Sequence, residues 1–524
     1  MAYLNFVLHA HLPFVRHPEH ARFLEEDWLY EAMTETYIPL LMEFEALEKD
    51  NLPFRITMSL TPPLCEMLAD PLLQDRYAAH LDRLRELAEK ECERLKHDAR
   101  LGALAAMYRN RFEACRLKFD SLSRNLLNGF RHYRERGNLE ILTCGATHGF
   151  LPNLRHSPRA VEAQLHVAAN NHERHFGVRP QGIWLGECGY YPGLDRHLKD
   201  AGLRYFFTDT HGILQGDPPS PKGCYAPVET PAGVFCFARD PESSKAVWSA
   251  EEGYPGDGRY REFYRDIGFD LDQEYIAPYI HPMGLRIPTG VKYHRITGRG
   301  MDKDAYVEQW ALDATQEHSA HFLFNRDRQA EWLDSRLGGT PANIVCPYDA
   351  ELFGHWWYEG PRFLGAVMRR ALTEPHGVTL ASPRDYLDRH PNPPKSQPAF
   401  SSWGAGGYAD VWLNGTNDWI YPHLHRVADR MNEVANLPEQ GDLDRRARNQ
   451  MARELLLAQS SDWAFIMKTG TMVEYAVRRT KIHVHNCHEL ADQIESGRID
   501  EGYLHNLELT DNVFPEIDYG VYRG

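Results

Sequence analysis

The chain has 524 residues, 43% of them hydrophobic, and a formal net charge of -16 at pH 7. Such a chain can bury a sizeable core, and its length suggests about two to four domains. The negative charge argues against a general binder of nucleic acid or of an anionic membrane, because both are polyanions.

No apolar stretch reaches the roughly 18 to 20 residues that a membrane-spanning helix needs. The N-terminal sequence MAYLNFVLHAHLPF lacks the basic region and the long apolar run of a signal peptide. Nine cysteines are scattered without a CxxC pair, and their odd number cannot all pair within the chain. We therefore expect a cytoplasmic protein with reduced cysteines.

Short apolar runs in chain order predict strands at 3–8, 54–60, 139–143, 182–185, 205–208, 234–237 and 343–346. Between about 73 and 136 the sequence is charge-rich and helical, which indicates a helical insertion. Alternating strands and helices predict a parallel-stranded barrel. The proline-rich stretch from about 385 to 400 indicates a boundary linker, and amphipathic patterns at 427–436, 443–460 and 473–496 predict C-terminal helices. The expected domains are 1–395 and 396–524.

Two carboxylate positions follow apolar runs in the same way. The stretch IVCPYDAELFGHWWYEGP (344–361) places Asp349 and Glu351 after a strand, and GIWLGECGYYPG (182–193) places Glu187 after another. Barrel enzymes keep their chemistry at the carboxyl-terminal ends of strands. A single acid there more often caps the next helix. Two acids, each among aromatic rings that can stack on sugars, favour glycosidic-bond chemistry, which needs a nucleophile and a general acid/base.

Further motifs make a family recognisable: HAHLPFVRHPEH (9–20), TCGATHGF (143–150), SSWGAGGYADVWLNGTNDWIYPHLH (401–425), AQSSDWAFIMKTGTMVEYAVRRT (458–480) and DNVFPEIDYGVYRG (511–524). With these the chain resembles, almost end to end, glycoside hydrolase family 57 and its branch of 1,4-α-glucan branching enzymes. The resemblance implies an α/β fold, an incomplete (β/α)7 parallel-stranded barrel with a helical insertion and a C-terminal helical domain. It also implies a retaining double displacement with Glu187 as nucleophile and Asp349 as general acid/base.

Several residues are candidates for contact with an α-1,4-glucan. Histidine ring nitrogens can bind sugar hydroxyls, and tryptophans can stack on sugar rings, although a single tryptophan is more often part of the core. In the resembled branch a mobile loop with an aromatic tip excludes water, and the segment 239–265 is its expected counterpart. The candidate for the tip is Tyr254, although a tyrosine packed beneath the loop fits the sequence equally well. The substrate-binding candidates are His9, His11, His148, Tyr254, Trp356, Trp403, Trp412 and Asp418.

Two other classes of protein remain alternatives. The pair His9 and His11 also begins metal-dependent amidohydrolase-like barrels, but no set of further ligands is evident at later strand ends, so we expect no metal and no cofactor. A non-catalytic glucan-binding protein on the same barrel is disfavoured because both Glu187 and Asp349 are present.

The choice among enzymes depends on small energies. Hydrolysis and branching differ only in whether water or a sugar hydroxyl releases the glucosyl-enzyme, and a tenfold preference is about 1.4 kcal/mol. The spacing between Glu187 and Asp349 is shorter than expected of archaeal branching enzymes and favours hydrolysis. We expect a 1,4-α-glucan branching enzyme, with an α-amylase or a 4-α-glucanotransferase as alternatives. The sequence leaves the oligomeric state open.

Overall fold

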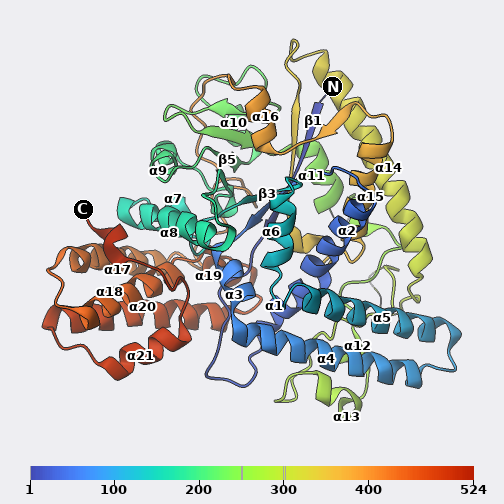
Figure 1. The fold of residues 1–524 in the computed structure, drawn as a ribbon, viewed down its shortest axis with the longest axis horizontal. Helices are drawn as coiled ribbons and strands as arrows, with labels where there is room; N and C mark the ends of the chain where they lie inside the picture. The colour runs from blue at the N-terminus through green and yellow to red at the C-terminus, as the bar shows by residue number, and fades with distance from the viewer. Residues whose placement is uncertain (1, 250–251, 299, 301) are drawn as a thin grey trace.

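A barrel of parallel strands forms the centre of the molecule, and helices surround it (Figure 1). The computed structural model describes residues 2–524 except 250–251, 299 and 301. The parallel strands are β1 (Ala2–Ala10), β2 (Ile56–Leu60), β3 (Leu139–Leu142), β4 (Gly182–Ile183), β5 (Tyr205–Thr208), β7 (Phe235–Ala238) and β8 (Asn343–Asp349).

The strands form two sheets that together make the barrel. One has the order β3-β2-β1-β8, and the other contains β4-β5-β7 with the antiparallel strand β6 (Val228–Glu229) at its edge. A parallel bridge between Thr143 and Ile183 joins β3 to β4. On the opposite side the N–H of Asp240, just after β7, donates to the carbonyl of Val345 within β8 at 2.9 Å. The expected seven-stranded, incompletely closed barrel is confirmed. The strand β9 (Val378–Leu380) pairs with the start of β1.

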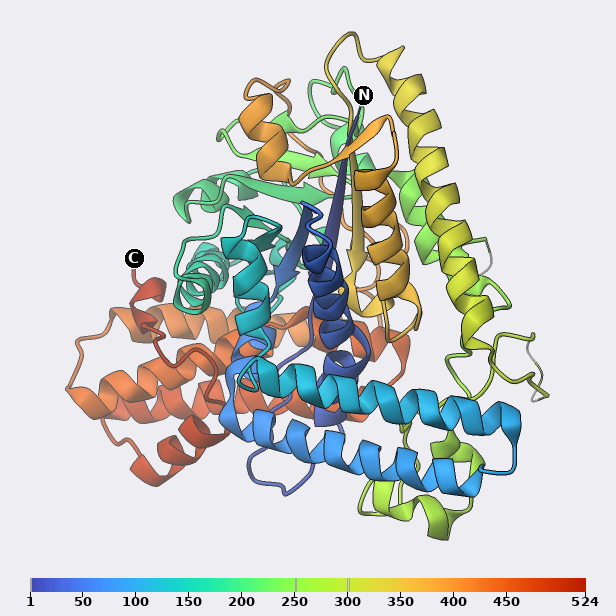
Figure 2. The same cartoon turned by 45° about the vertical axis from the view of Figure 1, so that its right-hand side comes forward.

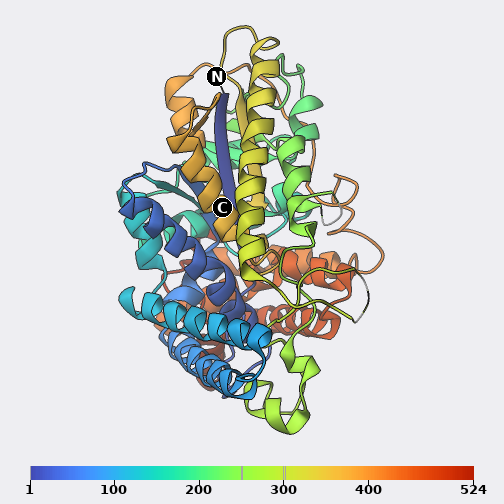
Figure 3. The ribbon, with the colours of Figure 1, turned by 90° about the vertical axis from the view of Figure 1, so that its right-hand side faces the viewer.

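The barrel strands are almost continuously apolar because they are covered on both faces. In β1 the residues from Leu4 to Ala10 are all buried. The covering helices include two that lie side by side along the barrel, α14 and α15 (Figure 3). The elements around the barrel are α1 (Glu26–Ala32), the π-helical turn η1 (Met33–Tyr37), α2 (Ile38–Lys49), α3 (Pro62–Ala69), α6 (Leu127–Glu135), α7 (Leu151–Leu154), α8 (Pro158–Phe176), α9 (Leu194–Asp200), α10 (Thr210–Leu214), α11 (Pro241–Trp248), α14 (Glu308–Asp334), α15 (Gly360–Thr373) and α16 (Pro383–Arg389).

The charge-rich segment is helical, as predicted. Helices α4 (Pro71–Arg94) and α5 (Ala99–Ser121) pack against each other beyond the end of the barrel (Figure 2). In α4 the buried positions recur at helical spacing, Tyr77, Leu81 and Leu84 among them, so one face meets α5 and the other meets solvent. Two short helices, α12 (Ile267–Asp270) and α13 (Gln273–Ile276), lie nearby, and Tyr275 donates to Glu91 of α4 at 2.7 Å. The last part of the segment, α6, packs on β3.

The C-terminal region is helical, and it lies beside the strand ends of the barrel (Figure 1). Its core is the contact between α18 and α20. The three predicted helices are confirmed, and two shorter ones accompany them. The helices are α17 (Ile420–Asn436), α18 (Asp442–Ala458), α19 (Ser461–Thr469), α20 (Val473–Ser496) and α21 (Glu501–Thr510).

The proline-rich stretch before these helices is bound to the barrel along its length. Lys395 bridges to Glu229, Gln397 to Asp217 and Ser401 to Tyr190. The stretch therefore has the composition of a linker, but it is not a free linker, because bridges to three other segments hold it in place. The division of the chain at residue 395 stays a prediction.

All nine cysteines are unpaired. Within the described part of the chain, no helix combines the length and the apolar content that crossing a bilayer requires.

The loop after β8 has one position that only glycine fits. Gly354 has φ +119, and a Cβ there would lie 1.9 Å from the Glu35 carbonyl oxygen. We expect Gly354→Ala to lower the free energy of unfolding by more than about 2 kcal/mol, because backbone must move. The control is Gly415→Ala, where a Cβ meets nothing within 4 Å, and it should stay within about 0.5 kcal/mol of wild type. Chemical denaturation measures both. Equal stability of the two variants would contradict this account of the loop.

Candidate active site

Both predicted catalytic acids lie at the carboxyl-terminal end of the barrel. Asp349 is the last residue of β8 and is in register with His9 of β1. Glu187 follows β4 in the short turn η2 (Gly186–Cys188), with φ 62 and ψ 22. This is the left-handed region that residues other than glycine rarely adopt, and Cys188 also has a positive φ of 51. Backbone strain of this kind is concentrated at functional sites.

Three side chains surround the carboxylate of Glu187. Trp403 Nε1 donates to Oε2 at 2.8 Å, and the Ser461 hydroxyl donates to Oε1 at 3.1 Å. His148 Nδ1 lies 3.6 Å from the same Oε1. Trp403 and Ser461 follow the barrel in sequence, so the C-terminal region fixes the position of this acid.

The predicted histidines form one array beside Glu187. His9 Nε2 and His148 Nε2 are 2.8 Å apart, and the rings of His11 and His148 stack with centroids at 3.8 Å. The ring of His9 stacks on Trp184 at 4.9 Å. His148 has φ 59, a second strained position at this site. The structure therefore brings His9, His11 and His148 together at the acid, as the sequence predicted.

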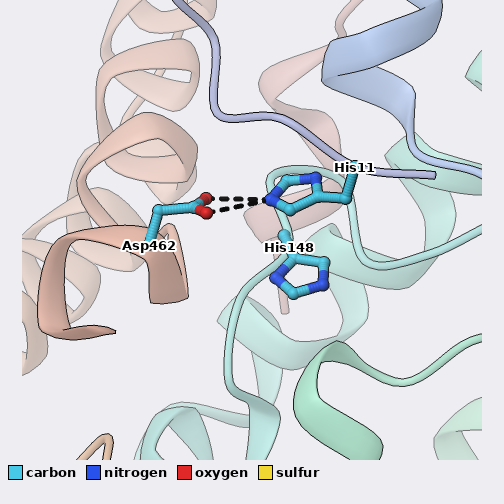
Figure 4. A group of neighbouring side chains, drawn as sticks. All are labelled: His11, His148 and Asp462. Carbon is cyan, nitrogen blue, oxygen red and sulfur yellow. Dashed lines mark hydrogen bonds and ion pairs between the residues drawn. The ribbon is translucent and has the colours of Figure 1, made fainter. Parts of the chain in front are cut away.

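An acid that sequence reasoning missed completes the array. Asp462, at the start of α19, accepts from His11 Nε2 with oxygens at 3.0 and 3.1 Å (Figure 4). Burial disfavours the imidazolium, but the carboxylate of Asp462, together with those of Glu187 and Glu351, outweighs it and raises the pKa of His11. Burial also disfavours the carboxylate, yet the pKa of Asp462 is lowered to about 2, chiefly by His11. A charged pair thus joins the segment just after β1 to the C-terminal helices. Its only signal in the sequence was the motif at 458–480.

The two catalytic candidates have different electrostatic surroundings. Burial raises the pKa of Glu187 to about 7, and the hydrogen bonds from Trp403 and Ser461 oppose this rise. Burial raises the pKa of Asp349 well above its ordinary value, and the charges of Glu351 and Glu187 add to the effect. No described residue donates a hydrogen bond to the Asp349 carboxyl to offset this. Asp349 is therefore the better proton donor and Glu187 the better anion.

A third acid lies beside Asp349. Glu351 accepts from the His11 N–H at 3.2 Å and from the Tyr37 hydroxyl. Both donors hold it to one side of the catalytic candidates, and its charge helps to keep Asp349 protonated. The sequence indicated Glu351 at the strand end but gave it no role.

The tryptophan candidates differ in exposure. Trp403 bonds Glu187, as described above. Trp412 is 2% exposed and stacks on Phe150 at 5.2 Å, so its faces are covered and its packing role dominates. Trp356 is 53% exposed and stacks on Phe263 at 4.2 Å, which leaves its outer face open. Asp418 is exposed in the turn before α17.

Tyr254 lies in a cluster of its own. It begins the turn η3 (Tyr254–Gly256), its hydroxyl bonds His321 at 2.9 Å, and its ring packs on Phe363 at 5.5 Å. These contacts hold the tyrosine against α14 and α15. Tyr254 is partly buried here, which matches the alternative of a packed tyrosine, and its role at the tip of a mobile loop stays a prediction. Two residues of the expected loop, 250–251, lie outside the described part of the chain.

One group of side chains at this site has the residue types that bind metal ions. Single ligand atoms of His11, His148 and Asp462 lie within 4.8 Å of one another. His11 nitrogens already bond Thr61 and Asp462, and those of His148 bond His9 and Ser461. This donor set is satisfied by the protein itself, and the expectation of no metal stays a prediction.

A parallel barrel with paired carboxylates at its strand ends defines a class of carbohydrate-active enzymes, and comparison with known proteins specifies the family. The family model described as glycosyl hydrolase family 57 matches residues 5–395, and the one described as 1,4-alpha-glucan branching enzyme, C-terminal, matches residues 423–522. The chain belongs to glycosyl hydrolase family 57.

Individual relatives cover nearly the whole chain. A 1,4-alpha-glucan branching enzyme of Thermococcus kodakarensis is 33% identical, in a match that covers 99% of this chain and 78% of the relative. A probable 1,4-alpha-glucan branching enzyme of Mycobacterium tuberculosis is 30% identical, in a match that covers 95% of this chain and 93% of the relative. Among solved structures, an alpha-amylase from Thermotoga maritima has a TM-score of 0.93 and 49% identity, covering 99% of each chain. A branching enzyme of this family from Pyrococcus horikoshii has a TM-score of 0.90 and 34% identity, over 100% and 97%.

The indole hydrogen bond to Glu187 generates a test on pH. Trp403→Phe removes the donated N–H, so the pKa of Glu187 should rise and the acidic limb of kcat/KM should move to higher pH. The shift should be about one to two units, the value of one hydrogen bond to a charged group. The wild-type limb is expected near pH 7, the pKa that burial gives Glu187.

The matched control is Trp412→Phe. The Trp412 Nε1 is buried without a hydrogen-bond partner in the described part of the chain, so its loss should leave the limb in place. Equal shifts in the two variants, or a shift to lower pH in Trp403→Phe, would contradict the account.

Proposed function

We propose that the protein is a 1,4-α-glucan branching enzyme that cleaves an α-1,4 linkage and transfers the chain to a 6-hydroxyl. One observation supports this above the others: Glu187 and Asp349 stand at two strand ends with electrostatic surroundings that separate their protonation. Relatives of this name match 95% or more of the chain. The substrate we propose is an α-1,4-glucan such as amylose, as part of glycogen-like synthesis in the cytoplasm.

The first half of the proposed reaction forms a glycosyl-enzyme. Asp349 gives its proton to the glycosidic oxygen, and the Glu187 carboxylate attacks the anomeric carbon as the bond to that oxygen breaks. The hydrogen bonds from Trp403 and Ser461 keep Glu187 in the orientation of attack. A separation of about 5 to 5.5 Å between the two carboxyl groups is the geometry that such a retaining reaction requires.

The second half returns the enzyme to its starting state. Asp349, now a carboxylate, takes the proton from a 6-hydroxyl, and that oxygen forms an α-1,6 bond as the Glu187 ester breaks. Water in place of the hydroxyl gives hydrolysis. The array of His9, His11 and His148 places neutral and charged imidazoles beside the Glu187 carboxylate. Their ring nitrogens are bonded within the protein, so a sugar hydroxyl binds there by replacing one of these bonds.

An α-amylase is the second candidate, and a specific observation favours it. The 49% identical structure that matches over nearly the whole chain is that of a protein named as an alpha-amylase. The spacing between the acids points the same way. The packing of the Tyr254 side chain against α14 and α15 also supports this candidate, because an aromatic tip that excludes water is what we associate with branching.

The nucleophile assignment predicts a loss of turnover with binding retained. Glu187→Gln keeps the side-chain shape but removes the attacking charge, so kcat should fall by about three orders of magnitude or more while amylose still binds. The control is Glu351→Gln, which removes a neighbouring charge that we place outside the reaction and should cost far less. Near-normal turnover of Glu187→Gln would refute the assignment.

Product analysis decides between the two candidates. After incubation of wild-type protein with amylose, new α-1,6 linkages are counted against new reducing ends. Branching predicts an excess of α-1,6 linkages. Reducing ends without new branches would move the assignment to an α-amylase.

A further inference from the structure

A cavity of about 290 Å³ lies apart from the catalytic acids, and we call it the Lys292 cavity. Its lining includes Glu31, Glu35, Tyr264, Phe269, Lys292 and His355. It adjoins a second hollow of about 440 Å³, with which it shares Tyr264, Asp266 and Phe269.

The cavity opens at the same end of the barrel as the active site. Glu31 and Glu35 lie in α1 and η1, which follow β1, whereas Phe269 and Lys292 lie between β7 and β8. His355 follows β8, shortly after Asp349. Because carboxyl ends of parallel strands meet on one side of a barrel, these segments border the same rim. The turn η1 also reaches the active site, since Tyr37 donates to Glu351.

Most charged groups of the cavity already have partners. Glu35 binds His355 Nδ1 at 2.8 Å and Arg261 at 3.5 Å. Asp266 accepts from the backbone N–H groups of Gly268, Thr289 and Gly290 at 2.8 to 2.9 Å. These groups form the wall of the cavity and are not free to bind a ligand ion.

Two groups have no such partner. Lys292 is 3% exposed, and its ammonium lies 4.3 Å from the centre of the Phe263 ring. Its backbone bonds the Tyr108 hydroxyl, but its ammonium makes no hydrogen bond or ion pair with any residue that the structure describes. Glu31 likewise lacks a partner among the described residues. Burial raises the pKa of Glu31 to about 8, with the charge of His355 opposing the rise, so its carboxyl is protonated near neutral pH. An unpaired ammonium in a buried position costs free energy unless a ligand or water binds it.

The chemistry of the walls selects among ligands. Lys292 needs a hydrogen-bond acceptor, and a protonated Glu31 both donates and accepts. The carboxylates of Glu35 and Asp266 repel an anion. Two exposed rings border the cavity, Tyr264 at 79% and Phe269 at 50% exposure, and both offer flat apolar faces. A neutral, polyhydroxylated ring meets all three conditions.

We propose that the Lys292 cavity binds glucose units of an α-glucan chain, as a second glucan site on the same rim as the catalytic acids. This rests on the proposed function, because it takes the same substrate class. The site would hold the part of a donor or acceptor glucan that extends beyond the reacting bond.

The test is calorimetric titration with maltohexaose, in a Glu187→Gln background so that the sugar is not consumed. The parent should bind two molecules per chain. Adding Phe269→Ala should weaken one of the two steps by about three- to tenfold, the value of one stacked ring, and adding Lys292→Met should remove that step. The other step should be unchanged in both.

The matched control is Phe324→Ala in the same background. Phe324 is 56% exposed, on α14, and does not line the cavity, so its loss should leave both steps unchanged. Melting temperatures identify any variant that fails to fold. If Lys292→Met fails to fold, the Phe269→Ala variant, which changes an exposed side chain, still tests the proposal.

Three outcomes would overturn the proposal. They are a single binding step in the parent, equal effects of Phe269→Ala and Phe324→Ala, and binding of inorganic phosphate that Lys292→Met abolishes while maltohexaose does not bind. A single step that survives Phe269→Ala refutes this site and leaves the proposed function standing. No product from amylose with the wild-type protein refutes the proposed function itself.

Discussion

The carboxylate of Glu187 is buried at a strained turn, and the hydrogen bonds that hold it come from outside the barrel. Trp403 and Ser461 supply them, and the His11–Asp462 pair adds a charged contact between the segment just after β1 and α19. Without these donors the folded site would leave this acid unpaired in a poorly solvated place, at a cost of several kcal/mol. The C-terminal helices are therefore part of the active site. Folding of the two regions is coupled through the same few side chains.

This coupling also separates the roles of the two acids. Desolvation raises the pKa of both carboxyls, so burial alone would protonate both near neutral pH. Hydrogen bonds reach Glu187 and oppose the rise, whereas the Asp349 carboxyl is flanked by Glu351 and receives none from the described residues. The difference in hydrogen bonding makes one group the anion and the other the proton donor. The same arrangement serves hydrolysis and branching, because they diverge only after the glycosyl-enzyme has formed.

Much of the barrel could be predicted from the sequence, because parallel strands buried on both faces are continuous apolar runs. β5 was predicted at its observed residues, and β1 and β8 were predicted slightly short. The long helix α14 was missed, since its mixed polar surface lacks one clear apolar face. The short helices α19 and α21 were missed because their patterns are too brief to be periodic.

Some residues of the candidate active site could also be predicted from the sequence, and others could not. Glu187, Asp349 and the three histidines could be proposed from the sequence because each belongs to a local motif at a strand end. Ser461 and Asp462 were missed because their role exists only in three dimensions, through contacts with residues hundreds of positions away. The packing of Tyr254 could not be predicted from the sequence for a related reason. Its neighbouring glycines permit an exposed turn, but packing partners on α14 and α15 are invisible in the local sequence.

The most direct measurement of the central claim is to trap the covalent intermediate. An Asp349→Asn variant treated with α-maltosyl fluoride should form the glycosyl-enzyme, because fluoride leaves without acid assistance, and release it slowly, because the base is absent. Mass spectrometry of the digested protein then locates the sugar. The account predicts a maltosyl ester on Glu187. A label on Glu351 or Asp462, or the absence of any covalent label while fluoride is released at the wild-type rate, would contradict it.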